Sequence, residues 1–216
     1  VKYYFFVPAL VIIFVLLIAF IVLFNQAERR IPVQYAKRVV GRKQYGGQSS
    51  HIPVKVTMAG VLPIIFAGAL LAIPATIEAF VKVEEGSFWA GFFNMFDQTS
   101  WFYSVLYFIL IVAFSYFYIA IQYNPVEMAN NLQKNNGAIP GIRPGKPTAD
   151  FISRIIGKIT FIGAMFLGII ALLPTIIGAV SGISNVTIGG TTVIIVVSVA
   201  LETARTLESQ MMMRHY

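Results

Sequence analysis

NQAERRIPVQYAKRVVGRKQYGGQSSHIPVKV, residues 25–56, separates two segments that are apolar enough to suit only a lipid bilayer. The stretch contains seven Lys or Arg residues and a single acidic residue, Glu28. A basic loop between two membrane spans is typical of the cytoplasmic side of a membrane protein. Such a loop also offers a docking surface to a large, negatively charged partner.

The composition of the whole chain indicates an integral membrane protein. Its 216 residues are 57% hydrophobic and 12% charged, with a mean hydropathy of +0.77, well outside the range of soluble domains. Cysteine is absent, which excludes disulfides and thiolate chemistry. No basic leader with a cleavage motif precedes the first apolar segment, so we expect no signal peptide and interpret the chain as part of a longer protein.

Five segments are apolar over about 20 residues, the length that crosses a bilayer. They are residues 3–24, 57–81, 101–122, 151–177 and 186–207. The last contains a β-branched run, TTVIIVVSVAL, which would suit a buried strand in a soluble fold. An isolated strand in lipid leaves its backbone groups unpaired, so a helix is favoured there. We therefore predict an all-α polytopic membrane protein with five transmembrane helices in one membrane domain, residues 1–216.

The positive charges predict the orientation in the membrane. Fourteen of the sixteen Lys and Arg residues lie in residues 25–56, residues 123–158 and the C-terminal tail, and only Lys2 and Lys82 lie on the opposite side. We expect the N-terminus outside and the C-terminus in the cytoplasm. The cytoplasmic loops are then 25–56 and 123–150, and the external loops are 82–100 and 178–185. Trp89 and Trp101 occupy positions typical of an interfacial aromatic belt.

Chemically reactive groups are missing from the predicted spans. Their central parts contain no Asp, Glu, Lys, Arg or His, although proton-coupled transporters normally need such residues at depth. His51 and His215 lie far apart in the sequence and lack the spacing of metal ligands. Paired carboxylates, a phosphate-binding loop and a nucleophile elbow are absent as well. We therefore expect no cofactor, no metal and no enzymatic activity.

The two cytoplasmic loops have patterns of their own. Apolar residues alternate with polar ones at 31–35 and 52–56, which predicts two short strands. Residues 124–134 begin with Asn-Pro and favour a short helix, and the following Gly- and Pro-rich run holds Arg143 at the tip of a stiff turn. As an alternative, these basic residues serve only as topology determinants or contact lipid headgroups.

Several stretches in these regions resemble the C-terminal half of the SecY family, the central subunits of the bacterial protein-translocation channel. The matching stretches are QAERRIPVQYAKR, GGQSSHIPVKV, MAGVLPIIFA, NPVEMANNL, GAIPGIRPGKPTADFI, GGTTVIIVV and LESQMMMRHY. The resemblance implies that the five spans correspond to spans six to ten of a ten-span fold with two pseudo-symmetric halves. The first half, with its plug and the opposing gate helices, would then be absent from this chain.

The resemblance also implies roles for residues of the spans. Ile65 and Ile195 match the constriction that seals the pore, although from sequence alone both would be taken as core or lipid-facing. The second span matches one wall of the lateral gate, and its Pro and Gly residues favour a bendable helix. These proposed hinge residues are Gly60, Pro63, Gly68 and Pro74. The alternative is that Pro and Gly are simply common in membrane helices.

The family's cytoplasmic loops dock the SecA ATPase or the ribosome, and Arg143 matches the key basic position. The other basic positions implied are Lys37, Arg38, Arg42 and Lys43. The implied partners are the N-terminal half of the channel, the SecE and SecG subunits, signal sequences, translocating polypeptides and membrane lipids. The expected function is the passage of secretory proteins across the bacterial plasma membrane, and of membrane proteins into it.

Two other classes of protein also fit part of the pattern. Half of a secondary transporter would use the interrupted second span as a broken-helix substrate site, but the lack of buried ionisable groups and the large basic loops argue against it. A lipid-binding scaffold would explain the charge but not the stiff turn around Arg143.

Overall fold

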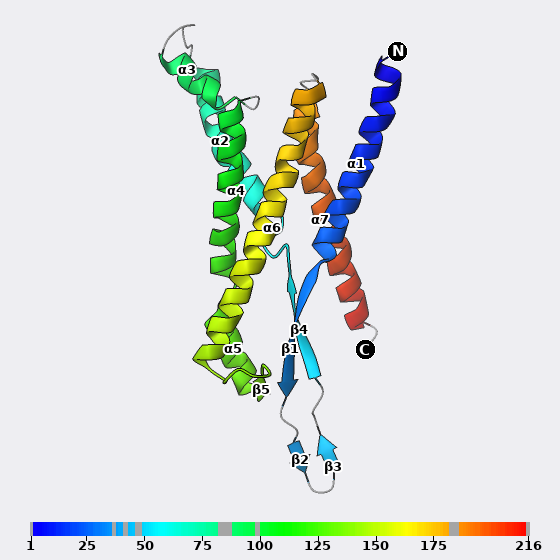
Figure 1. Ribbon diagram of the computed structural model, residues 1–216, viewed down its shortest axis with the longest axis vertical. Helices are drawn as coiled ribbons and strands as arrows, with labels where there is room; N and C mark the ends of the chain where they lie inside the picture. The colour runs from blue at the N-terminus through cyan, green and yellow to red at the C-terminus, as the bar shows by residue number, and fades with distance from the viewer. Residues whose placement is uncertain are drawn as a thin grey trace.

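The computed structural model describes residues 2–35, 38–40, 43–45, 49–81, 88–97, 100–181 and 186–214. Long helices run roughly side by side, and a β hairpin projects from one end of them (Figure 1). The helices are α1 (Lys2–Gln26), α2 (Leu62–Phe80), α3 (Phe88–Met95), α4 (Trp101–Gln122), α5 (Pro125–Lys134), α6 (Lys146–Ser181) and α7 (Val186–Arg214).

Three helical segments among the described residues are long and apolar enough to cross a membrane. They are Leu62–Phe80, Trp101–Lys134 and Lys146–Ile176. The fold is thus a helical membrane fold. α1 and α7 cover the predicted first and fifth spans, and the count of five membrane crossings stays a prediction. The helix predicted for the β-branched run is confirmed, because α7 continues through it.

The hairpin is built from strands of the first large loop. β1 (Glu28–Tyr35) pairs antiparallel with β4 (Ser49–Lys55), with Ile31 opposite Ile52. This confirms the two strands predicted from alternation. The far end of the hairpin carries a second antiparallel ladder, β2 (Arg38–Val40) with β3 (Lys43–Tyr45) (Figure 1). A short strand from the second loop, β5 (Gly137–Ala138), pairs with the free edge of β1.

The short helix predicted in the second loop is α5, and its start follows from local chemistry. The side chain of Asn124 accepts hydrogen bonds from the backbone N–H groups of Val126 and Glu127, at 3.1 and 3.4 Å. Asn is among the preferred N-cap residues. Pro125 occupies the first helical position, where a missing N–H costs nothing.

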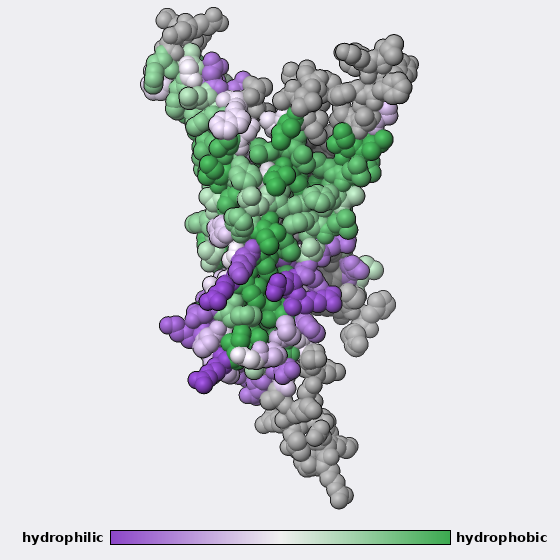
Figure 2. All heavy atoms as spheres, in the orientation of Figure 1, coloured by the Kyte–Doolittle hydropathy of each residue, from purple (hydrophilic) through white to green (hydrophobic). Residues whose placement is uncertain are grey.

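The packing is organised around α6, which lies against α4, α5 and α7. The apolar part of α6 has 56% of its residues buried, against 22% in the corresponding parts of α2 and α4. α2 and α4 therefore turn much of their apolar surface outward. Figure 2 shows the hydrophobic surface over the helices and hydrophilic residues gathered toward the hairpin end.

Two of the four predicted hinge residues lie outside the interior of the second-span helix. The apolar run begins at Thr57, but α2 begins only at Leu62. Gly60 lies in the preceding turn, where its φ of +60° suits glycine. Pro63 lies in the first turn of α2, where no intrahelical hydrogen bond is lost. Gly60 and Pro63 therefore do not lie in a helix interior, whereas Gly68 and Pro74 do. The hinge role of the four residues stays a prediction.

Candidate functional site

A hydrophobic cluster at the hairpin end joins the two large loops to the helices. We call it the junction core. It consists of buried residues Ile31, Val33, Val54, Ala59, Ile119, Leu132, Ile139, Ile152, Ile156 and Ile159. These side chains come from β1, β4, the turn before α2, α4, α5, the loop after β5 and α6. The two loops therefore form one packed unit that is continuous with α4 and α6.

The base of the hairpin is fixed to the end of α1. The backbone N–H of Val56 donates to the carbonyl of Ala27 at 3.0 Å. The hydroxyl of Thr57 donates to the side-chain oxygen of Asn25 at 2.8 Å. The hairpin thus leaves the helices through a closed, hydrogen-bonded neck.

Arg143 lies in the turn between β5 and α6, and its side chain is exposed. On one side of it, Ile139 is only 4% exposed and Ile142 packs against the junction core. The N–H of Ile142 donates to the carbonyl of Ile139 at 3.1 Å. Gly141 and Gly145 have φ values of +81° and +98°, which glycine adopts without strain. The turn predicted around Arg143 is confirmed.

On its other side, Arg143 is held by the start of α6. The buried hydroxyl of Thr148 donates to the backbone carbonyl of Arg143 at 2.9 Å. The N–H groups of Thr148 and Ala149 both donate to the carbonyl of Gly145 at 3.1 Å. The backbone of the turn is therefore tied at both ends while the guanidinium points away from the core. Sequence reasoning missed Thr148, although a Thr at a helix start is a recognisable signal.

Two of the remaining predicted docking residues, Arg38 and Lys43, belong to the outer end of the hairpin. Arg38 starts β2, and Lys43 starts β3, where its backbone lies opposite Val40. Lys37 and Arg42 lie outside the residues that the structure describes. The β2–β3 ladder lies beyond the sheet of β4, β1 and β5 (Figure 1). The structure thus places Arg38 and Lys43 at the outer end of the hairpin, apart from the Arg143 turn.

The two predicted pore residues lie on different helices. Ile65 is on α2 and is 41% exposed, and Ile195 is half-buried on α7. α2 packs mainly on α4, whereas α7 packs on α6 and α1. α2 and α7, which carry the two residues, are therefore not main packing partners within this chain.

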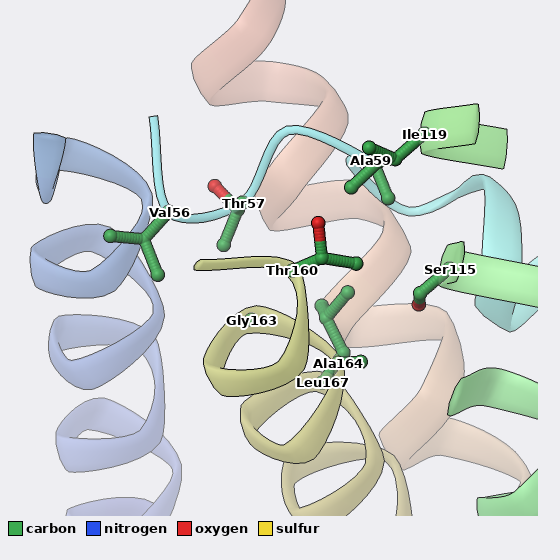
Figure 3. A pocket seen from close by; sticks show the side chains of 9 residues that line it. All are labelled: Val56, Thr57, Ala59, Ser115, Ile119, Thr160, Gly163, Ala164 and Leu167. Atoms are coloured by element: carbon green, nitrogen blue, oxygen red, sulfur yellow. The ribbon is translucent and has the colours of Figure 1, made fainter. Parts of the chain in front are cut away.

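A hollow lies where the end of the hairpin meets α4 and α6. Residues from the hairpin end, α4 and α6 line it (Figure 3). They are Val56, Thr57, Ala59, Ser115, Ile119, Thr160, Gly163, Ala164 and Leu167. The hydroxyls of Ser115 and Thr160 both donate to carbonyls of their own helices at 2.7 Å. The walls leave no room for a water molecule. This hollow is a packing seam and not a ligand site.

Gly163 lies at this seam and brings α6 against the end of the hairpin. A β carbon at Gly163 would collide with the backbone carbonyl of Val56. Only glycine permits this approach without a shift of the backbone. Within the described part of the chain, no group of three or more His, Asp or Glu side chains is placed to hold a metal ion.

Comparison with known proteins decides the family. The family model described as SecY matches residues 2–204 of the chain. The chain belongs to the SecY family. The secondary-transporter and lipid-scaffold alternatives therefore lose their support.

The relatives show how much of a SecY protein this chain spans. The protein translocase subunit SecY of Streptomyces coelicolor is 46% identical over 209 residues, which cover 95% of this chain and 47% of the relative. The Mycobacterium bovis subunit of the same name is 44% identical over 210 residues, covering 93% of this chain and 48% of the relative. The chain spans about half the length of the curated relatives it matches.

Solved structures show the same fold. A protein-conducting channel matches with a TM-score of 0.58 at 20% identity, covering 92% of this chain and 47% of the channel chain. A SecY protein whose plug domain stabilises the closed channel matches with a TM-score of 0.54 at 19% identity, covering 90% of this chain and 47% of the other. At such low identity the likeness concerns the fold alone.

Proposed function

We propose that this SecY chain forms the C-terminal half of a protein-conducting channel. The channel passes secretory proteins across the bacterial plasma membrane and releases membrane proteins into it. The single observation that carries this proposal is the exposed Arg143 turn, which stands on the junction core and is continuous with α4 and α6. Such a turn transmits the push of a docked motor directly to the membrane helices.

The docked partner is the SecA ATPase or the ribosome, which supplies the energy for transport. A guanidinium on a fixed turn engages carboxylates or phosphate oxygens through paired hydrogen bonds. The same residue therefore serves a protein motor or ribosomal RNA. In this arrangement the hairpin end of the molecule faces the cytoplasm, with the N-terminus of α1 on the outside. SecE and SecG are further partners of the assembled channel in this proposal.

The pore forms when the N-terminal half of the channel faces this chain. Ile65 and Ile195 then contribute to a ring of aliphatic side chains around the passing polypeptide. Aliphatic side chains make a narrow, poorly wetted barrier to ions and offer no fixed hydrogen bonds to a moving chain. The 41% exposure of Ile65 within this chain fits a residue whose covering partner is another segment.

The lateral gate uses α2 as one wall. Most of the apolar part of α2 is uncovered by the rest of this chain, so α2 is free to face signal sequences, lipid or the other half. Pro74 removes a backbone hydrogen bond in the interior of α2. Gly68 adds no side chain to the surface of the same helix. α2 therefore bends at low cost when a signal sequence enters.

Charge reversal at Arg143 tests the proposed function. The assay is SecA-driven export into membrane vesicles that contain the complete channel. Arg143→Glu removes a charge-assisted contact worth about 1.5–3 kcal/mol, so export should fall by about 10-fold or more. Lys134→Glu is the matched control, since Lys134 is also exposed and basic at the hairpin end but lies at the end of α5. Near-normal export by Arg143→Glu, with normal membrane insertion, would contradict the proposal.

A further inference from the structure

The short helix α3 carries an aromatic stripe along one side. Its exposed apolar side chains are Phe88 (84% exposed), Trp89 (60%), Phe92 (40%) and Met95 (52%). At about 100° per residue these positions fall within about one third of the helix circumference. The side away from the stripe carries small or polar residues, Ala90, Gly91 and Asn94. α3 is thus amphipathic, with its aromatic stripe outside the core of this chain.

Aromatic contacts fix α3 to the beginning of α4. Phe93 is only 7% exposed, which makes it the buried residue of the helix. The ring of Phe92 lies 5.1 Å from that of Phe96, and the ring of Phe96 meets that of Phe102 edge-on at 5.9 Å. Aromatic pairs at such distances add stability beyond their buried area. The stripe is therefore presented in a fixed direction.

The stripe continues the apolar surface of two membrane helices. α3 lies between α2 and α4 in the sequence, packs on both, and is at the end of the molecule opposite the hairpin (Figure 1). The neighbouring helix ends are also apolar and exposed, Phe80 at 86% and Trp101 at 81%. The helix itself contains no charged residue. Its surroundings are thus the end of the lipid-facing surface of α2 and α4.

We propose that α3 is a phospholipid-binding interfacial helix in the leaflet opposite the hairpin. Phe88, Trp89 and Phe92 insert between the headgroups and the upper acyl chains, and Asn94 faces the water. Trp is enriched at this depth because its ring is amphipathic. Phe is typical of the apolar face of helices that lie in the membrane interface. Through its contacts with α2 and α4, α3 fixes the depth of these two helix ends in the bilayer.

A fluorescence experiment on the full chain measures the depth of the stripe. The chain has no native Cys, so a single Cys carries a bimane label in phosphatidylcholine vesicles. Phe92→Cys labels the stripe, and Asn94→Cys labels the opposite side of the same helix. Ile109→Cys, on the exposed side of α4, marks the bilayer interior, and Ser50→Cys, on exposed β4, marks the water. The quenchers are lipids spin-labelled near the headgroup or near the chain end, and iodide in the buffer.

The label at position 92 should be quenched more strongly by the shallow spin label than by the deep one. The order should reverse at position 109, and the labels at 94 and 50 should be quenched by iodide. Quenching at 92 by iodide as strong as at 94 would place the stripe in water and overturn the proposal. Protection at 92 from all three quenchers would overturn it too, because it would mean that a protein surface covers the stripe.

Discussion

The hydroxyl of Thr148, in the first turn of α6, donates a hydrogen bond to the backbone carbonyl of Arg143 across 2.9 Å. Thr148 is only 3% exposed, while the Arg143 side chain is exposed. The residue that we propose to meet a partner is thus attached through its own backbone to α6, a helix of 36 residues. A displacement of the turn must displace the start of α6 with it.

Removal of this hydrogen bond should loosen the turn. Thr148→Val keeps the shape of the side chain but leaves the Arg143 carbonyl without its donor, at a cost of about 1 kcal/mol. Hydrogen exchange of the amides of Gly141, Ile142, Arg143 and Gly145 should accelerate by about fivefold, and motor-driven export should fall. The control is Thr206→Val, whose exposed hydroxyl donates to the carbonyl of Glu202 in α7. Equal exchange at 141–145 in Thr148→Val and parent would show that this bond does not order the turn.

The contact between α6 and the hairpin end should make Gly163 sensitive to substitution. Gly163→Ala forces a β carbon against the Val56 carbonyl, and overpacking of this kind costs about 1–3 kcal/mol. Gly157→Ala, on the same helix, meets nothing within 4 Å and should be neutral or up to about 1 kcal/mol stabilising. Thermal unfolding in detergent compares the two. Equal melting temperatures of the two variants would show that the seam accommodates a β carbon at position 163.

Loss of the aliphatic ring should make the assembled channel leak. We expect the double variant Ile65→Gly with Ile195→Gly to raise ion conductance at rest in planar bilayers, because water can wet a widened constriction. The control pair is Ile73→Gly with Val196→Gly, which removes exposed apolar side chains from the same two helices and carries the same helix penalty of about 1 kcal/mol per glycine. Equal conductance of the two pairs would mean that the pore lining has been misassigned.

The interior proline of α2 should govern gate opening, and the proline of its first turn should not. Pro74→Ala restores a backbone donor and favours a straighter helix, which should shift the gate equilibrium by about 1–3 kcal/mol, or roughly 5- to 150-fold. Pro63→Ala restores no intrahelical bond and should leave gating near that of the parent. The measurement is the rate of crosslinking between a Cys on α2 and one on the N-terminal half during signal-sequence engagement. Similar crosslinking rates for Pro74→Ala and the parent would show that Pro74 does not act as a hinge of the gate.

Local patterns predicted the local elements correctly. Alternation at 31–35 and 52–56 predicted β1 and β4, and Asn124-Pro125 predicted the start of α5. Hydropathy misplaced the start of α2, because the turn at 57–61 is apolar too and the left-handed φ of Gly60 leaves no trace in a hydropathy average. α3 lies inside the loop predicted to be external and was not predicted, since eight residues are too short to show a clear helical period.

Long-range contacts could not be predicted from one sequence. The pairing of β5 with β1 joins residues about a hundred positions apart and involves only two residue pairs, Gln34 with Ala138 and Tyr35 with Gly137. Neither the two-residue strand nor the approach of Gly163 to Val56 has a local signature. The match of Ile65 and Ile195 to the pore constriction came from family resemblance, and no packing within this chain brings their helices together as main partners.

The β1–β5 pairing also has a consequence for exchanging parts between related proteins. A β carbon at position 137 would stand 2.9 Å from the ring of Tyr35, so the residue at 35 limits what position 137 accepts. A chimaera that takes residues 25–56 from one parent and residues 137–148 from another would join two halves of one small sheet that were shaped separately. In such a chimaera the two segments should therefore be taken from the same parent.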